Sequence, residues 1–389
     1  MISTSTMWAS ASGRARWSAA AGSALLFCGL AAGCDDGDEP GTDAGGTDAG
    51  PPPMIDAGYD AGPPLVDAGP PCEGPPGLYE DPACTVIAAG VRAYEPRFTL
   101  WADGAEKERY IYLPPGETID ASDPDNWVYP VGTRLYKTFL LGGVRLETRV
   151  LEKTDPGTGL TAWRMRVYAW DEAQYNVEDV TNAGLERRSN VLGTDHDIPE
   201  GADCVQCHNG TRDLINGFSA IMLNHDGAGV TLETLLDENL LVPEFARSLA
   251  DVPSSGAGTT AEVDALGYLH ANCGHCHHEP LPGSGGVCHT PACNRGLFFW
   301  LPTGVATVQA TPTYATSVNQ INTAPFGGRT CRIKPGDPDN SVIVYRMESR
   351  MTGMQMPPLA TEQVHTAGVA MVRAFISGMT DAPSAACMP

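Results

Sequence analysis

The pattern of apolar and polar positions predicts strands between about residues 98 and 171. Apolar and polar side chains alternate there with a period of two, which is typical of strands with one buried face. Two such runs flank Gly142-Gly143, a two-residue signal for a hairpin turn. In the second run, one face would carry Val144, Leu146, Thr148 and Val150. We predict a sandwich-like antiparallel β-domain, in which the aromatic residues form either the core or a binding face.

After about residue 196 the spacing of apolar residues changes to that of helices. The predicted helical segments are residues 214–222, Thr231 to Leu241, a helix that begins after Thr259, a short helix from Ser341 to Arg346, and about Glu362 to Met379. Thr259 and Glu262 have the spacing of a capping box, and Thr361 would cap the last helix. A mainly helical part therefore follows the β-domain.

Two copies of a Cys-x-x-Cys-His motif carry the candidate chemistry of the chain. They are Cys204-Val205-Gln206-Cys207-His208 and Cys273-Gly274-His275-Cys276-His277. This spacing is the attachment signature of c-type haem, in which two thiols form thioethers and the histidine binds the iron. We predict two covalent haems c, with His208 and His277 as proximal iron ligands. A zinc site shared by the motifs is the alternative, because cysteine and histidine are also zinc ligands.

A distal methionine is predicted for the second haem. Met356 precedes Pro357-Pro358, and cytochrome c domains often place the ligand methionine before a proline ahead of the last helix. Met354 is the nearest alternative. For the first haem, the open candidates are Met222, which also fits a helix core, His225, His196 and His270.

The N-terminus has the order of an export signal. Arg14 and Arg16 precede an apolar, small-residue run, Ala19 to Ala32, that ends before Gly33-Cys34. We predict a lipoprotein whose Cys34 is lipidated. An ordinary cleaved signal is the alternative. Residues 35–71 repeat Asp-Ala-Gly among prolines, which predicts a disordered linker.

These observations divide the chain into five parts. The predicted parts are a signal peptide (1–33), the lipidated cysteine and linker (34–71), a β-rich domain (72–195), a first haem segment (196–258) and a second haem domain (259–389). Export would place the protein in the cell envelope, on the periplasmic side or at the outer membrane, held by its lipid.

Charge and cysteine usage narrow the possible partners. The net charge is −23, which argues against nucleic-acid binding and suits either solubility or a redox partner with a basic docking surface. After the motifs, Cys28 and Cys34 are set aside, six of the twelve cysteines remain, and an exported chain favours their pairing. The nearest pairs are Cys72–Cys84 and Cys288–Cys293, which would leave Cys331 with Cys387.

With these residues in hand, the chain resembles a family of bacterial dihaem c-type cytochromes that carry a β-rich N-terminal region. The resemblance runs from about Phe98 to Met379 and lies in Trp101-Ala-Asp-Gly, Tyr112-Leu-Pro-Pro-Gly, Tyr136-Lys-Thr-Phe, Leu146-Glu-Thr-Arg, Asp171-Glu-Ala-Gln, Asn272-Cys-Gly-His-Cys-His and Met356-Pro-Pro-Leu. It implies a multidomain protein with cytochrome c-type haem domains that transfers electrons in the cell envelope. The alternatives are a dihaem peroxidase, which needs an open iron position, and a redox-linked binding module that uses the β-domain.

Overall fold

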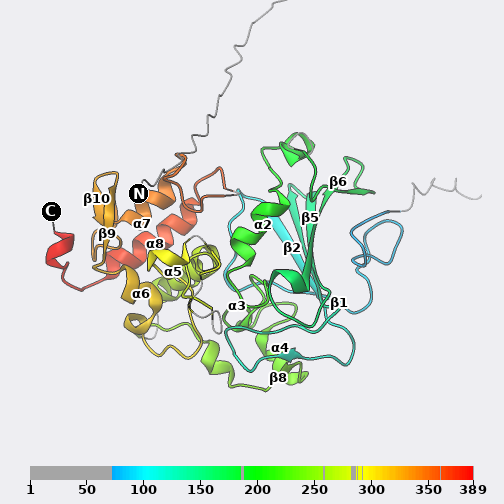
Figure 1. The fold of residues 1–389 in the computed structure, drawn as a ribbon, viewed down its shortest axis with the longest axis horizontal. Coiled ribbons are helices and arrows are strands. Elements are labelled where there is room, and N and C mark those ends of the chain that lie inside the picture. The colour runs from blue at the N-terminus through cyan, green and yellow to red at the C-terminus, as the bar shows by residue number, and fades with distance from the viewer. Residues whose placement is uncertain are drawn as a thin grey trace, which may run out of the picture. The chain divides into compact units, whose positions relative to one another are not determined.

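Six antiparallel strands form the largest sheet of the protein (Figure 1). The computed structural model describes residues 72–184, 188–256, 259–281, 286, 288–290, 292–359 and 361–388, all within one unit, Leu65–Pro389. The predicted signal peptide, Cys34 and the linker lie outside these residues. The strands, in spatial order, are β1 (Val91–Ala93), β2 (Glu106–Tyr112), β4 (Arg134–Leu141), β5 (Val144–Lys153), β6 (Trp163–Trp170) and β7 (Val177–Asp179).

The hairpin between β4 and β5 turns at Gly142 and Gly143, as the sequence predicted. Both residues have positive φ angles, 56° and 80°, which suit glycine and the tight turns of two-residue hairpins. The antiparallel β-region is therefore confirmed.

The described residues do not form the sandwich that we expected, because they contain one large sheet, of which one face packs on the helical region. The other described sheets have two strands each: β3 (Ile119–Asp120) with β8 (Leu241–Val242), and β9 (Ile321–Phe326) with β10 (Arg329–Cys331). One face of the large sheet contributes Tyr136 and Val150 to a core with Leu78 and Val91. The aromatic residues Trp127, Trp163 and Trp170 are buried, which makes them core.

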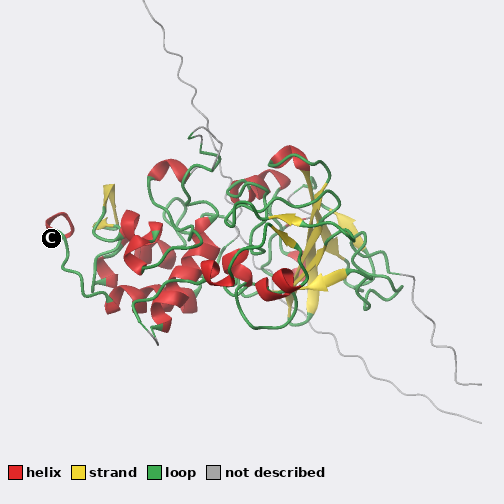
Figure 2. Cartoon of the chain, turned by 90° about the horizontal axis from the view of Figure 1, so that it is seen from below, coloured by secondary structure: helices red, strands yellow, loops and turns green. Residues whose placement is uncertain are grey.

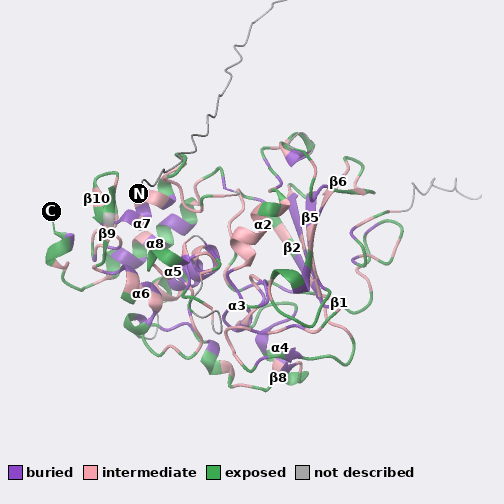
Figure 3. Ribbon diagram, viewed as in Figure 1, coloured by how far each residue is buried: buried purple, intermediate pink, exposed green. Residues whose placement is uncertain are grey.

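The opposite face of the large sheet shares one hydrophobic core with the helical region. Ile111, Leu135 and Trp163 from the sheet pack in this core with side chains from the rest of the chain. Those partners include Phe218, Ile221, Leu232, Leu235, Leu266 and Phe375. Figure 3 shows buried residues running through the sheet and the helices. The packing therefore ties the β-region to the helical region.

Most of the regular elements after β7 are helical, and Figure 2 draws the helices in red. The α-helices are α2 (Gly201–His208), α3 (Ala220–Leu223), α4 (Leu232–Asp237), α5 (Thr260–Leu269), α6 (Pro312–Ser317), α7 (Val342–Glu348) and α8 (Thr366–Gly378). The short 3-10 turns are η1 (Leu160–Ala162), η2 (Val191–Gly193), η3 (Arg247–Ala250), η5 (Cys293–Arg295), η6 (Val308–Ala310), η7 (Pro338–Asn340) and η8 (Ala385–Cys387), and η4 (His270–Gly274) is a π-helical turn. No described helix has the length and apolar character needed to cross a membrane.

Helix α5 packs against α8, and glycine makes that approach possible. A Cβ atom on Gly368 would lie 2.3 Å from the ring of Tyr268. Around this crossing lies a second core, made by Tyr268, Leu269, Phe299, Val318, Ile333, Val344, Met347, Val369, Val372 and Ile376. The entry and exit helices of the second motif region therefore fix each other.

Several predicted helix limits were wrong. Helix α8 begins at Thr366 and not near Glu362, because the Asp103 carboxylate accepts hydrogen bonds from the backbone N–H groups of Glu362 (2.8 Å) and Gln363 (3.0 Å). The predicted capping box at the start of α5 is absent, since the Glu262 carboxylate accepts hydrogen bonds from Ser255.

Two further helices are shorter than predicted. Of residues 214–222 only the last three are helical, as part of α3 (Ala220–Leu223), and Leu214 has a φ of 62°, which an α-helix cannot contain. Helix α4 ends at Asp237, because Asn239 adopts a φ of 55° and β8 follows. By contrast, the short helix after Ser341 is confirmed as α7.

The predicted disulfide pairing is confirmed. Bonds join Cys72 to Cys84, Cys288 to Cys293, and Cys331 to Cys387. The free cysteines among the described residues are those of the two motifs: Cys204, Cys207, Cys273 and Cys276.

A buried ion pair joins the sheet to the segment after the first motif. The Asp213 carboxylate accepts hydrogen bonds from Lys153 Nζ (2.5 Å), Trp163 Nε1 (2.7 Å) and the Tyr129 N–H (2.8 Å). The side chains of Lys153 and Asp213 are 0% and 1% exposed. Removal of one partner would leave the other charge buried and unpaired.

We expect Asp213→Ala to lower the free energy of unfolding of the full chain by about 3–5 kcal/mol, because Lys153 would lose its counter-charge. Urea unfolding followed by circular dichroism measures the loss. The control is Glu152→Ala, which breaks an exposed pair with Arg164 and should cost less than about 1 kcal/mol. Equal losses in the two variants would contradict the assignment.

Candidate cofactor site

The first motif lies on helix α2, which Figure 1 places beside the large sheet. Glu200 and Asp203 form a reciprocal capping box at the start of this helix, so its orientation is fixed where it leaves the preceding loop. His208 is the last residue of α2, and its Nδ1 donates a hydrogen bond to the Leu214 carbonyl oxygen at 2.6 Å. This bond orients the imidazole and leaves Nε2 as the nitrogen that can bind a metal.

The second motif has the same arrangement. It follows α5 through the π-helical turn His270–Gly274, a distortion that occurs frequently at functional sites. His277 Nδ1 donates to the Leu297 carbonyl oxygen at 3.2 Å, and the ring packs edge-on against Phe299. The Nε2 atom of His277 is again the nitrogen left for a metal.

Burial keeps both motif histidines neutral. Desolvation lowers the pKa of His208 to about 4 and that of His277 to about 4. Neutral imidazole is the form that coordinates metal. At neutral pH neither nitrogen would have to lose a proton before binding iron or zinc.

The two motifs, although far apart in sequence, lie against each other. Ligand atoms of Cys207, His275 and Cys276 all lie within 4.8 Å of one another. The Cys276 thiol also donates to the Gln206 carbonyl oxygen at 3.3 Å. A Cβ atom on Gly210 would lie 1.7 Å from the His275 carbonyl oxygen, so only glycine allows this approach. We assigned no role to His275 from the sequence, and nothing local to it signals this contact.

The thiols of the two motifs differ in acidity. Contact with the Cys276 side chain lowers the pKa of the Cys207 thiol, and the same contact raises the pKa of Cys276. Burial raises the pKa of Cys204, and it raises the pKa of Cys273 to about 12. Cys207 is therefore the thiol that most readily becomes a thiolate, the form that reacts and binds metal.

The structure places Met356 against helix α7. The Met356 N–H donates to the Arg346 carbonyl oxygen (2.9 Å), and Arg346 Nε donates to the Met354 carbonyl oxygen (3.0 Å). The charge of Arg346 also acts on His277, whose pKa it helps to lower. The segment with Met354 and Met356 thus packs on Arg346, whose charge acts on His277. Met356 stays a predicted ligand.

The histidines considered for the first motif all have other partners. His225 uses both ring nitrogens, since Nε2 donates to the Glu95 carbonyl oxygen (2.7 Å) and Nδ1 accepts from the Gly227 N–H (2.9 Å). His196 Nε2 bonds the buried Glu147 carboxylate at 2.8 Å. His270 Nδ1 accepts from the Leu301 N–H at 3.0 Å.

The side chain of Met222 has no such hydrogen bond among the described residues, and Met222 is 2% exposed on helix α3. It stays a predicted ligand of lower rank, beside its reading as a core residue.

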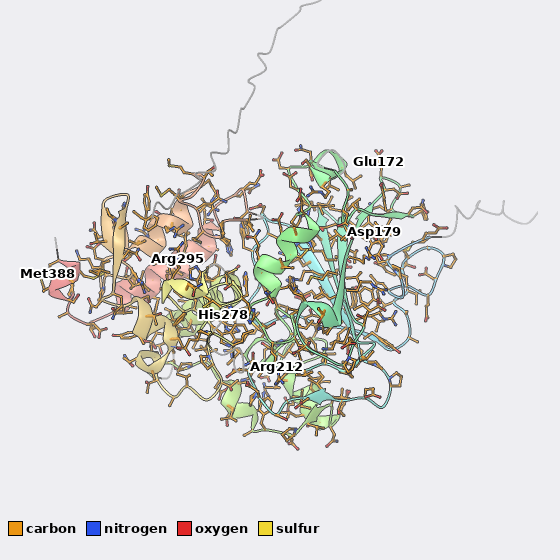
Figure 4. All side chains as sticks on the ribbon, in the orientation of Figure 1. Glu172, Asp179, Arg212, His278, Arg295 and Met388 are labelled. Atoms are coloured by element: carbon orange, nitrogen blue, oxygen red, sulfur yellow. A yellow bond between two sulfur atoms is a disulfide. The ribbon has the colours of Figure 1, made fainter. Side chains whose placement is uncertain are left out.

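Two cavities adjoin the motifs. One is lined by His208 and Asn216 together with sheet residues Leu135, Lys137, Arg149 and Leu151. The other is lined by Gly210, His278 and Trp300, among others. Figure 4 labels His278, which lies between the sheet and the helical region. The sequence did not point to Lys137 or Asn216, because their approach to His208 depends on tertiary packing.

The donor set fits a covalent haem at each motif. Each has two free thiols at the attachment spacing and a neutral, oriented imidazole. The chain matches no protein-family model, no curated protein and no solved structure. The choice of cofactor therefore depends on these donors and their surroundings.

We expect Gly210→Ala to destabilise the full chain by about 1–3 kcal/mol, because the added methyl group would collide with the backbone of the second motif. Thermal unfolding, with the free energy taken at one temperature, measures the change. Gly378→Ala is the matched control, since its Cβ would meet nothing within 4 Å, and it should change stability by less than about 0.5 kcal/mol. A neutral Gly210→Ala would mean that the motifs do not abut.

Proposed function

We propose that the chain is a dihaem c-type cytochrome that transfers electrons. Cys204 and Cys207 would attach one haem, and Cys273 and Cys276 the other. His208 and His277 would be the proximal ligands. One observation supports this most: in each motif, Nδ1 of the histidine donates a hydrogen bond to a backbone carbonyl oxygen. The bond leaves Nε2 free, and one such histidine follows each thiol pair.

Haem supplies one-electron redox chemistry when it is bound, and the residues of this chain would set its environment. The Nδ1 hydrogen bonds increase the basicity of Nε2 and hold the imidazole planes. Around the second motif, Cys273 packs on the core formed by α5, α7 and α8. Such a shell excludes water, and burial is one of the means by which proteins tune haem potentials.

The contact between the motifs supports an electron carrier with two centres. Attachment residues of both motifs meet at Cys207 and Cys276, so electrons entering at one centre would have a short path to the other. The net charge of −23 suits a redox partner with a basic docking surface and not a nucleic acid. We further propose that lipid on Cys34 anchors the protein in the cell envelope, on the periplasmic side or at the outer membrane.

A zinc site is the second candidate, because one observation favours it. Cys207, His275 and Cys276 offer three zinc-type donors within 4.8 Å. Structural zinc usually takes four protein ligands, and the described residues supply three at this point. A zinc ion at this point would also not bind the Nε2 atoms of His208 and His277, which the Nδ1 hydrogen bonds orient.

Denaturing mass spectrometry should find two haem additions after co-expression with haem-attachment machinery. Replacing Cys204 and Cys207 together by Ala should reduce the count to one, because only the second thiol pair would remain. A matched double replacement of Cys288 and Cys293, which form a disulfide, should keep two. A bare polypeptide that instead holds one equivalent of zinc under native conditions would favour the second candidate.

Met356→Ala should remove the weak charge-transfer band of a ferric thioether complex. It should also lower one of the two reduction potentials, because a thioether ligand stabilises ferrous iron. Optical spectra and redox titration measure both effects. Met351→Ala is the control, since Met351 is 66% exposed and its loss should change neither. If Met354→Ala produces the effects in place of Met356→Ala, the ligand is Met354.

A further inference from the structure

Three cationic side chains lie directly opposite one another on the sheet face that shares its core with the helical region. Arg109 of β2 pairs with Lys137 of β4, and Lys137 pairs with Arg149 of β5. We call these three residues the cation row. Residues directly opposite in antiparallel strands project from the same face, and like charges there destabilise a sheet. The arrangement therefore requires an explanation beyond the stability of the sheet.

The carboxylates nearby do not balance these charges. Arg109 pairs with Glu95 at 2.9 Å, and Arg149 pairs with the buried Glu147 at 2.6 Å. Among the described residues, the side chain of Lys137 has no hydrogen bond or ion pair, and burial, followed by the charges of Arg109 and Arg149, lowers its pKa to about 7.

Lys107 lies two residues from Arg109 on the same face of β2, and among the described residues its side chain donates only to the carbonyl oxygens of Leu100 and Ala105. The four cations Lys107, Arg109, Lys137 and Arg149 thus face two carboxylates. The two lysines therefore have no carboxylate partner in the described part of the chain, although they lie in a largely buried place. Buried charges without partners are costly, so an anionic partner is expected.

The cation row faces the first motif. Lys137 and Arg149 line the same cavity as His208 and Asn216. Asn216 Nδ2 donates to the Cys207 carbonyl oxygen at 3.0 Å, which holds this side chain against the first motif. An ammonium group without a partner among the described residues thus lies beside a motif histidine, which points to a ligand that carries acceptor oxygens.

We propose that Lys137 and Arg149, supported by Arg109 and Lys107, hold the two propionate groups of the haem attached at Cys204 and Cys207. This inference rests on the proposed function. Two carboxylates match the two lysines that have no carboxylate partner, and lysine and arginine form charge-assisted hydrogen bonds with carboxylates. The sheet is then one wall of the first haem site, which gives the β-region a role in cofactor binding.

Lys137→Gln tests the proposal in the full haem-loaded chain. Loss of a cation next to a haem favours ferric iron, so one of the two potentials should fall by about 59 mV, a tenfold change in the equilibrium constant for one electron. Lys107→Gln should lower the same potential by less. Lys137→Arg should keep the equilibrium constant for reduction within threefold of the parent value. The haem content should not change, and neither should the optical spectrum, which reports the axial ligands.

Arg166→Gln is the matched control. Arg166 pairs with Val150 in the sheet register and is therefore on the opposite face, where it forms an ion pair with Asp179 at 3.6 Å. It removes the same charge from the same sheet and should move neither potential.

Three results would overturn the proposal. In the first, Lys137→Gln binds two haems and both potentials stay unchanged. In the second, Lys137→Gln changes the axial ligation, which would mean that Lys137 is an iron ligand in the parent. In the third, a potential of the parent protein changes with added inorganic phosphate, which would mean that the cation row binds a free anion. A parent protein with no haem at all would instead overturn the proposed function, and the propionate assignment with it.

Discussion

The close contact between Gly210 and the backbone of His275 is the constraint on which the candidate site depends. No side chain fits at position 210, since even a Cβ atom would lie 1.7 Å from the His275 carbonyl oxygen. This contact brings Cys207 next to Cys276 and joins a short segment beside the sheet to the helical region. Asp213, three residues later, secures the same segment to the sheet through Lys153 and Trp163.

The sequence was sufficient where structure is determined locally. Alternation and the Gly142-Gly143 turn predicted the β4–β5 hairpin, and apolar spacing predicted α5. It failed over residues 214–222, where the apolar spacing is helical but the backbone serves the motif. The Leu214 carbonyl oxygen accepts from His208, and Asn216 reaches back to the Cys207 carbonyl oxygen. These tertiary bonds override the local preference, as the bonds to Asp103 do at the start of α8.

The candidate site was predictable in its donors and not in its surroundings. The two motifs stand in the sequence, but the acceptors Leu214 and Leu297 have no signature because any residue offers a carbonyl oxygen. The approach of His275 to Cys207 and of Lys137 to His208 depends on how separate segments pack. Alternation places Lys137 and Arg149 on strand faces, yet it does not say which face receives the first motif.

The β-region contacts the second motif as well, which bears on how the protein is organised. The Trp101 N–H donates to Asn272 Oδ1 at 2.7 Å, and the Trp101 ring stacks on His365 at 4.1 Å just before α8. Asn272 lies in the π-helical turn that leads into Cys273. The loop before β2 thus holds the turn that positions the second thiol pair, while the sheet itself borders the first motif. A β-domain that served only to recognise a separate ligand would not need to contact both motifs. The contacts instead agree with the proposal of one unit, in which the β-region helps to position both motifs.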